Sequence, residues 1–174
     1  MKRKNSDLKS WNQNSDNLGI NVENLIEKLP FITPIKKVKP VKHETVDKYQ
    51  KLCEQLQGIY DELAILSKKS PNEAVNTFKL KFINKLLQDS NDFLNSKYRP
   101  FDDFSQFDLD EIPQNSDVVL MLSQYLHSFE KFRADSIIRK HVRWYWVIEA
   151  EKGQKGDEQG LIYSETTSPK RLRG

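Results

Sequence analysis

The sequence contains one cysteine, Cys53, among its 174 residues. An intramolecular disulfide is therefore impossible, and the thiolate-rich sites that hold structural zinc are excluded. The six glycines are spread along the chain, and none belongs to a glycine-rich turn of the kind that binds phosphate groups. Since a lone thiol is typical of a reducing compartment, these absences favour an intracellular protein without a cofactor.

Long apolar runs are also missing. No window approaches the roughly 18 consecutive apolar residues that a membrane-spanning helix needs. The amino-terminal Met-Lys-Arg-Lys leads into polar residues, unlike a secretory signal. We therefore expect a soluble cytoplasmic or nuclear protein with no membrane contact, and stretches 36–39 and 169–173 resemble short nuclear-import signals.

Residues with metal-binding or catalytic chemistry are scattered. His43, His127 and His141 each stand apart from other ligand residues, and the acidic stretch 102–111 lacks the central glycine of a calcium loop. Cys53 lies on the apolar face of a predicted helix, which favours a buried, inert thiol. The sequence therefore predicts no metal site and no catalytic residue.

Basic residues are absent from one long stretch, because no Lys or Arg occurs between Arg99 and Lys131. Residues 1–42 carry nine Lys/Arg against four Asp/Glu, and residues 131–143 carry five against one. A net charge of only +3 thus conceals a basic–acidic–basic order along the chain. Such an order influences long-range fields and the choice of partner.

The first 42 residues are polar and basic, and we expect a disordered tail. Within it, residues 18–32 form a short amphipathic segment suited to docking in a groove of a partner. Its candidate contact residues are Leu25, Ile26, Leu29 and Phe31. Residues 33–42 contain two prolines and four lysines, which predicts an extended linker.

Apolar residues at helical spacing predict three long helices, and hence a mainly α fold: an antiparallel helical bundle over residues 43–150. The first helix should span about 44–67, and the second should begin with the capping box at Ser70 and reach about residue 95. The second helix has two apolar stripes, as is usual for a central helix. They are Val75, Phe78, Phe82, Leu86 and Phe93, and Leu80, Ile83, Leu87 and Leu94.

The third helix should begin at Asn115 or Ser116 and either bend or break into two helices near 134–136, where the apolar spacing is interrupted before it resumes at Ile137 and Ile138. Residues 143–148 alternate aromatic and β-branched side chains, which favours a strand. Paired with residues 161–167, which belong to an otherwise flexible segment 151–174, that strand would form a short β-hairpin. The alternative is that the third helix continues to Glu151.

The acidic stretch carries phenylalanines at a three-residue interval, Phe101, Phe104 and Phe107. Either these rings are exposed and contact a partner, or they fold under the loop and cover the core. In both cases the carboxylates should remain outside. The candidate partner-binding residues here are Phe101, Asp102, Asp103, Phe104, Phe107, Asp108 and Asp110.

Basic residues beside aromatic ones suggest nucleic-acid binding as an alternative function, because phosphates and stacked bases would both find contacts. The candidates are Lys36, Lys37, Lys39, Arg139, Lys140 and Arg143. A second alternative is a small helical ribonuclease. His141 with Arg133 or Arg139 is similar to the Arg–His pair of HEPN-type ribonucleases, although the spacing differs.

The sequence as a whole favours a non-enzymatic interaction or scaffold subunit of a larger intracellular assembly, with nucleic acid as a possible component. A protein partner would bind the segment 18–32, the acidic phenylalanine loop, or both. The pattern does not define the oligomeric state.

Overall fold

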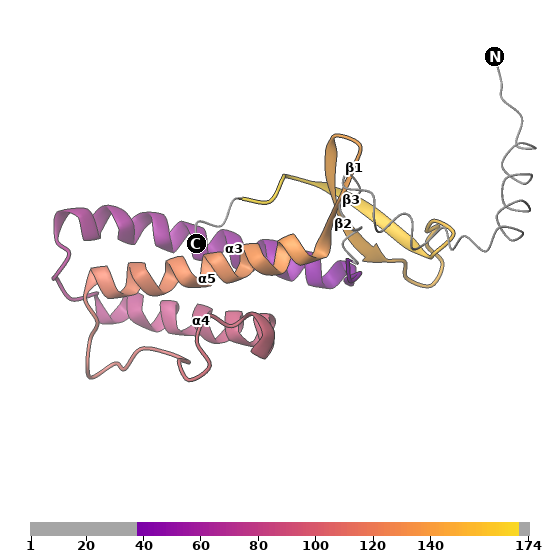
Figure 1. Cartoon of the computed structure of the whole chain (residues 1–174). Coiled ribbons are helices and arrows are strands. Elements are labelled where there is room, and N and C mark those ends of the chain that lie inside the picture. Colours follow the sequence, from indigo (N-terminus) through magenta and orange to yellow (C-terminus); the bar gives the residue numbers. More distant parts are fainter. Residues whose placement is uncertain (1–37, 171–174) are drawn as a thin grey trace, which may run out of the picture. The chain divides into compact units, whose positions relative to one another are not determined.

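The computed structural model describes residues 38–170, which form a mainly helical fold followed by a small sheet (Figure 1). The mainly α class is thereby confirmed. The elements are α3 His43–Lys69, α4 Thr77–Tyr98, α5 Asn115–Ser136, β1 Ile137–Lys140, β2 Arg143–Glu149 and β3 Leu161–Thr166. Several predicted features lie outside the described residues, namely the tail 1–37 with Leu25, Ile26, Leu29, Phe31, Lys36 and Lys37, and residues 171–174.

Helix α3 forms where the sequence predicts it. Val46, Tyr49, Leu56 and Leu63 recur at helical spacing and are all buried. The basic pair at 68–69 lies in the last turn, where the helix dipole favours positive charge. Each of these features depends on local sequence alone, which explains why this helix could be predicted.

Helix α4 begins later than the capping box predicts. It starts at Thr77, and the side chain of Asn76 accepts a hydrogen bond from the Phe78 backbone N–H at 2.8 Å. The backbone of residues 70–75 instead binds the chain just before α5. The Val75 N–H donates to the Pro113 carbonyl at 3.0 Å, for example. The predicted start at Ser70 is wrong because a tertiary contact uses these backbone groups.

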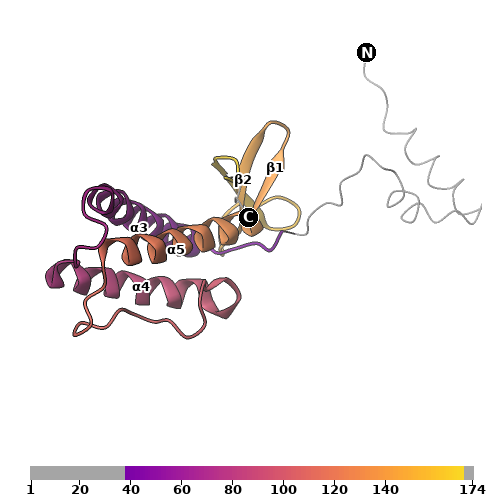
Figure 2. The same cartoon turned by 60° about the vertical axis from the view of Figure 1, so that its left-hand side comes forward.

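Helices α4 and α5 run in the same direction. Their starts are joined by a bridge between Ala74 and Gln114, and near their ends the Tyr98 hydroxyl donates to Asp135 at 3.0 Å. Helix α3 runs the opposite way, and the three helices lie side by side in both views (Figure 1, Figure 2). The connection 99–114 must therefore return along the whole length of α4.

Aromatic rings join the helices to the sheet. Tyr49 lies among Phe129, Phe132 and Trp146, with ring centroids 5.7, 6.1 and 5.0 Å away. Trp146 belongs to β2, so this cluster links α3, α5 and the sheet in one core. Burial of large rings contributes much of the stabilisation in a domain of this size.

The sheet has three antiparallel strands in the order β1-β2-β3, so the predicted two-stranded hairpin is wrong in strand number. The predicted strands do pair, since Trp146 of β2 faces Ser164 of β3. The extra strand, β1, begins at Ile137, where the apolar pattern was expected to resume a helix. Ile137 is buried opposite Trp146, and this cross-strand pair favours the extended conformation.

The segment just before α3 extends the sheet beyond the first residue of β1, because Val41 lies beside Ile148 of β2. The Val41 N–H donates to the Val147 carbonyl, and the Glu149 N–H donates to the Val41 carbonyl, both at 2.9 Å. The predicted linker therefore ends in an ordered contact, which fixes the direction in which the chain enters α3.

Candidate interaction surfaces

The acidic phenylalanine loop is held against α4 by side-chain amides. The Asn84 amide nitrogen donates to the Phe107 carbonyl at 2.8 Å, and its oxygen accepts from the Phe107 N–H at 2.9 Å. Asn91 donates to the Phe104 carbonyl at 3.3 Å. Both asparagines are buried, with 7% and 5% exposure. Since buried amides are costly when unsatisfied, these contacts fix the path of the loop.

The loop phenylalanines divide into two kinds. Phe104 and Phe107 are half-buried and pack against the core, with ring centroids 5.1 Å apart. Phe101 is 37% exposed. Of the two alternatives that the sequence left open, packing under the loop holds for Phe104 and Phe107, whereas Phe101 keeps surface that a partner can contact.

The acidic residues of the loop all face solvent. They are Asp102, Asp103, Asp108, Asp110 and Glu111. Three apolar side chains between and beside them, Phe101, Leu109 and Ile112, are exposed as well. We call these eight residues the acidic loop surface. It combines charge of one sign with apolar contacts on a backbone that α4 holds in place.

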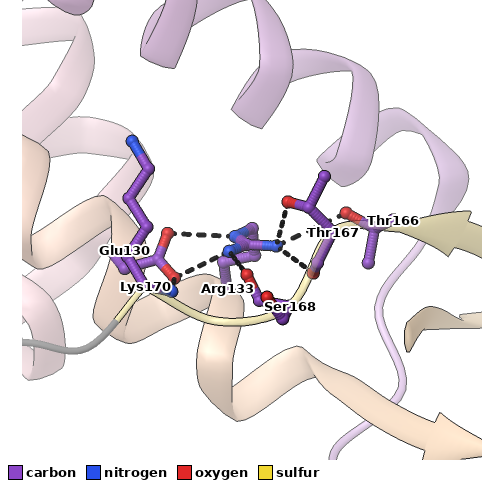
Figure 3. A network of polar contacts seen from close by, with 6 residues as sticks. All are labelled: Glu130, Arg133, Thr166, Thr167, Ser168 and Lys170. Carbon is purple, nitrogen blue, oxygen red and sulfur yellow. Dashed lines mark hydrogen bonds and ion pairs between the residues drawn. The ribbon is translucent and has the colours of Figure 1, made fainter. Parts of the chain in front are cut away.

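A buried ion pair lies on α5, close to the sheet. Glu130 and Arg133 form a bidentate pair, with Nη2–Oε1 at 2.7 Å and Nε–Oε2 at 3.0 Å (Figure 3). The side chains are 9% and 6% exposed. Burial by itself lowers the pKa of Arg133, but hydrogen bonds and charge from Glu130 outweigh it and hold this pKa above its ordinary value.

The pair holds the segment that follows β3. Arg133 donates to the carbonyls of Thr167 and Ser168 at 2.8 and 2.9 Å, and the Lys170 N–H donates to Glu130 at 2.7 Å (Figure 3). The guanidinium is therefore engaged in structure. Sequence reasoning missed the pair, although two charges three residues apart beside Phe129 and Phe132 were a signal.

A hollow of about 260 Å³ adjoins this pair, between α3 and α5. Cys53, His127, Glu130 and Lys170 are among its lining residues, whereas His141 is not. Burial raises the pKa of the Cys53 thiol, so the thiol stays protonated near neutral pH and is a weak nucleophile. Within residues 38–170, no three His, Cys, Asp or Glu side chains gather where they could hold a metal ion.

The basic stretch predicted to bind nucleic acid surrounds the turn between β1 and β2. Arg139, Lys140 and Arg143 are exposed there, as is Lys39 at the start of the described residues. Part of this charge is already engaged. Lys140 Nζ lies 3.0 Å from the centre of the Tyr163 ring, and Arg143 pairs with Glu165 at 2.9 Å.

The aromatic residues beside that turn face inward for the most part. Trp146 is buried, and Trp144 and Tyr145 are half-buried. His141 lies in the exposed turn itself, with a left-handed φ of 54°. Burial therefore keeps Trp146 from stacking on a nucleotide base, whereas the strand register sets Arg139 opposite the half-buried Trp144.

Two phenylalanines of α4 are unexpectedly exposed. Phe78 and Phe82 are 69% and 58% accessible, and their rings form an edge-to-face pair with centroids 4.9 Å apart. The prediction that this stripe is buried holds for Val75 and Leu86 but is wrong for Phe78 and Phe82. Leu66 of α3 is partly exposed as well. The sequence did not reveal this exposed surface, because its phenylalanines recur at the spacing of a buried helical stripe.

No family model matches the sequence, and no similar protein is found among curated proteins or solved structures. Within residues 38–170, the helices are too short or too polar to cross a membrane.

Proposed function

We propose that the protein is a non-enzymatic interaction subunit that binds a basic protein partner through the acidic loop surface. The observation that carries the proposal is the combination of a held backbone with exposed side chains. Asn84 and Asn91 fix the loop, while its carboxylates and three apolar side chains remain accessible. A binding segment that is ordered beforehand loses less conformational entropy when a partner docks.

The chemistry of the surface defines the partner. Its five carboxylates have no Lys or Arg within residues 100–130 to offset them, so they attract positive charge and steer association. Phe101, Leu109 and Ile112 supply apolar contacts, which give more binding energy than exposed ion pairs. A segment rich in Lys and Arg with interspersed apolar residues fits both features. Such segments are common in nucleic-acid-associated assemblies, the setting we propose.

A binding titration tests the proposal. The full chain is mixed with a fluorescent peptide of alternating Lys, Arg and Leu, and its affinity is compared with that of the variant D108N/D110N/E111Q. We expect the variant to bind at least about tenfold more weakly, since paired charges at interfaces contribute a kcal/mol or more. Phe101→Ala should weaken binding as well, without changing the helical circular dichroism.

The matched control is E44Q/E54Q/D92N, which removes the same charge from exposed positions outside the loop. It should retain nearly the affinity of the unmodified chain. Equal weakening by both triple variants would show non-specific attraction and contradict the proposal. The segment 18–32, with Leu25, Ile26, Leu29 and Phe31, stays a second proposed contact that lies outside the described residues.

Nucleic-acid binding is the second candidate, and the turn between β1 and β2 favours it. The register sets Lys140 opposite Arg143, and Arg139 lies one residue earlier on the same exposed tip. In R139Q/K140Q, the slope of log affinity against log salt should fall by roughly two, about one for each phosphate that the variant no longer neutralises. An affinity for single-stranded RNA that does not change with salt would eliminate this function.

The geometry favours the ribonuclease alternative least. It needs an arginine beside His141, yet Glu130 and the carbonyls after β3 hold the Arg133 guanidinium. Arg139 and His141 remain together near the exposed turn. A ribonuclease function would require that the protein cleaves RNA and that His141→Ala abolishes the cleavage.

A further inference from the structure

The acidic loop surface divides into two clusters. The backbone bends at residues 102–103 and again at 109–111, and it does not bend at residues 104–108 between them. The first cluster consists of Phe101, Asp102 and Asp103, and the second consists of Asp108, Leu109, Asp110, Glu111 and Ile112. All eight side chains are exposed. Each cluster therefore combines carboxylates with apolar surface that a partner can contact.

Helix α4 sets the distance between the two clusters. Asn91 donates to the Phe104 carbonyl, and Asn84 exchanges two hydrogen bonds with the backbone of Phe107. The two asparagines are seven residues apart, which is about 10 Å along the helix axis. Three loop residues cover that distance only as an almost fully extended chain. With the residues between these contacts and the bends added, the clusters lie roughly 15 to 20 Å apart.

The carboxylates of both clusters keep their charge for a partner. None of them forms an ion pair with another residue of the described range 38–170, where the ion pairs join other side chains, for example Lys79 with Glu62. Asp108 accepts a hydrogen bond from the Asp110 N–H at 2.8 Å, and this contact lies within the second cluster. A partner with positive charge therefore displaces no basic side chain of the chain itself.

We propose, on the basis of the function inferred above, that the basic partner is bipartite. It carries two groups of Lys or Arg, each with an apolar side chain, and each group contacts one cluster of the loop. A segment of like charges repels itself and is extended, so about five residues between the centres of the two groups span the distance between the clusters. A helical segment would need about ten residues or more for the same distance.

Two linked contacts bind more tightly than either contact alone. Once one group of the partner has bound, the second is confined near its own cluster, and its effective concentration depends on the spacer that joins the two groups. Because Asn84 and Asn91 hold the loop, the distance between the clusters is set before the partner arrives. The affinity should therefore depend on the length of a stiff spacer, at constant peptide charge.

The test titrates the full chain with three fluorescent peptides. One carries a single Lys-Leu-Arg group, and the others carry two such groups joined by three or by ten prolines. Proline spacers are stiff, at about 3.1 Å per residue, so the centres of the two groups lie about 19 and about 40 Å apart. We expect the three-proline peptide to bind at least about tenfold more tightly than the other two. The ten-proline peptide has the same charge and controls for non-specific attraction.

Variants of the protein provide the second measurement. D102N/D103N removes the charge of the first cluster, and D108N/D110N/E111Q removes that of the second. Each variant should bind the three-proline and ten-proline peptides with nearly equal affinity, because only one cluster remains charged. Equal affinity of the unmodified chain for these two peptides overturns the bipartite partner, and the proposed function stands if D108N/D110N/E111Q still weakens binding. Absence of binding to every peptide overturns both.

Discussion

Two pairs of phenylalanines, one on α4 and one in the loop that runs along it, differ in whether another segment of the chain covers them. Phe104 and Phe107 belong to an acidic loop, yet they pack against the core. Phe78 and Phe82 belong to an apolar helical stripe, yet they face solvent. The comparison teaches that helical spacing defines a stripe but does not say whether another segment covers it.

Which phenylalanines are covered depends on the path of the connection between α4 and α5. The regular part of α4, from Thr77 to the residue before the non-helical Asn95, is about 27 Å long at 1.5 Å per residue. Because α5 starts beside the start of α4, residues 99–114 must span that length, and an extended chain does so easily. Asn84 and Asn91 lie seven residues apart, which is two helical turns along one face of α4. Their hydrogen bonds to the loop determine the side of α4 along which it runs. The other side is left open.

Loss of Glu130 should have the largest effect on the free energy of unfolding. Like the acidic loop, the segment after β3 is held by a helix side chain, but here that side chain is charged. Glu130→Ala leaves the Arg133 charge buried without its carboxylate, so we expect unfolding free energy to fall by about 3–5 kcal/mol. Urea unfolding measures it. The double variant E130L/R133M should recover most of the loss, and a Glu130→Ala cost below about 1 kcal/mol would contradict a structural role for the pair.

Asn84→Leu should come next, since it removes the contact that directs the loop. Both backbone groups of Phe107 lose their partner, which should lower the free energy of unfolding by about 2–3 kcal/mol. Amide hydrogen exchange across 101–112 should also rise. Gln88→Leu, at an exposed position whose amide reaches Gln106, is the control and should cost much less. Similar costs for the two variants would show that burial of Asn84 is unimportant.

A methyl group added on the open side should be tolerated. A Cβ at Gly58 of α3 meets nothing within 4 Å, so Gly58→Ala should stabilise the protein by up to about 1 kcal/mol through helix propensity. In contrast, a Cβ at Gly156 would lie 2.7 Å from the carbonyl carbon of Gly160, and Gly156→Ala should destabilise. Thermal unfolding compares the two, and a loss of stability in Gly58→Ala would mean that this side is covered.

The smallest effect is expected in the loop between β2 and β3. An exposed carboxylate holds this loop, whereas buried amides hold the acidic loop. Hydrogen bonds from the Leu161 N–H and then the Tyr163 hydroxyl lower the pKa of Asp157. Because the pKa is lowered in the folded state, the ionised carboxylate stabilises the folded loop at pH values above the ordinary pKa of aspartate, about 4. This contribution is lost as the pH falls below that value and through the folded-state pKa. Amide exchange at Leu161 should rise there, and Asp157→Asn should abolish the pH dependence.

Much of the fold is predictable because it depends on local pattern. The spacing of apolar residues defines α3, and the alternation of residues 143–148 defines β2. The errors share a physical cause, which is competition from distant segments. Ser70 does not begin α4 because residues 70–75 bind the chain before α5, and Ile137 begins a strand because Trp146 pairs with it.

The surfaces were predictable in part. Carboxylates without nearby basic residues are expected to stay in water, and those of the loop do. Which phenylalanines remain exposed could not be derived from spacing, because Phe78 and Phe107 are equally apolar and differ only in what lies over them. A retrospective signal exists in Asn84 and Asn91, two amides within an apolar stripe that need backbone partners.

The most direct test of the central claim compares the two phenylalanine pairs by urea unfolding. We predict that F104A/F107A lowers the free energy of unfolding by at least about 2 kcal/mol more than F78A/F82A, because it removes rings that contact the core. Equal losses, or a larger loss for F78A/F82A, would contradict the assignment of the first pair to the core and of the second to the exposed surface.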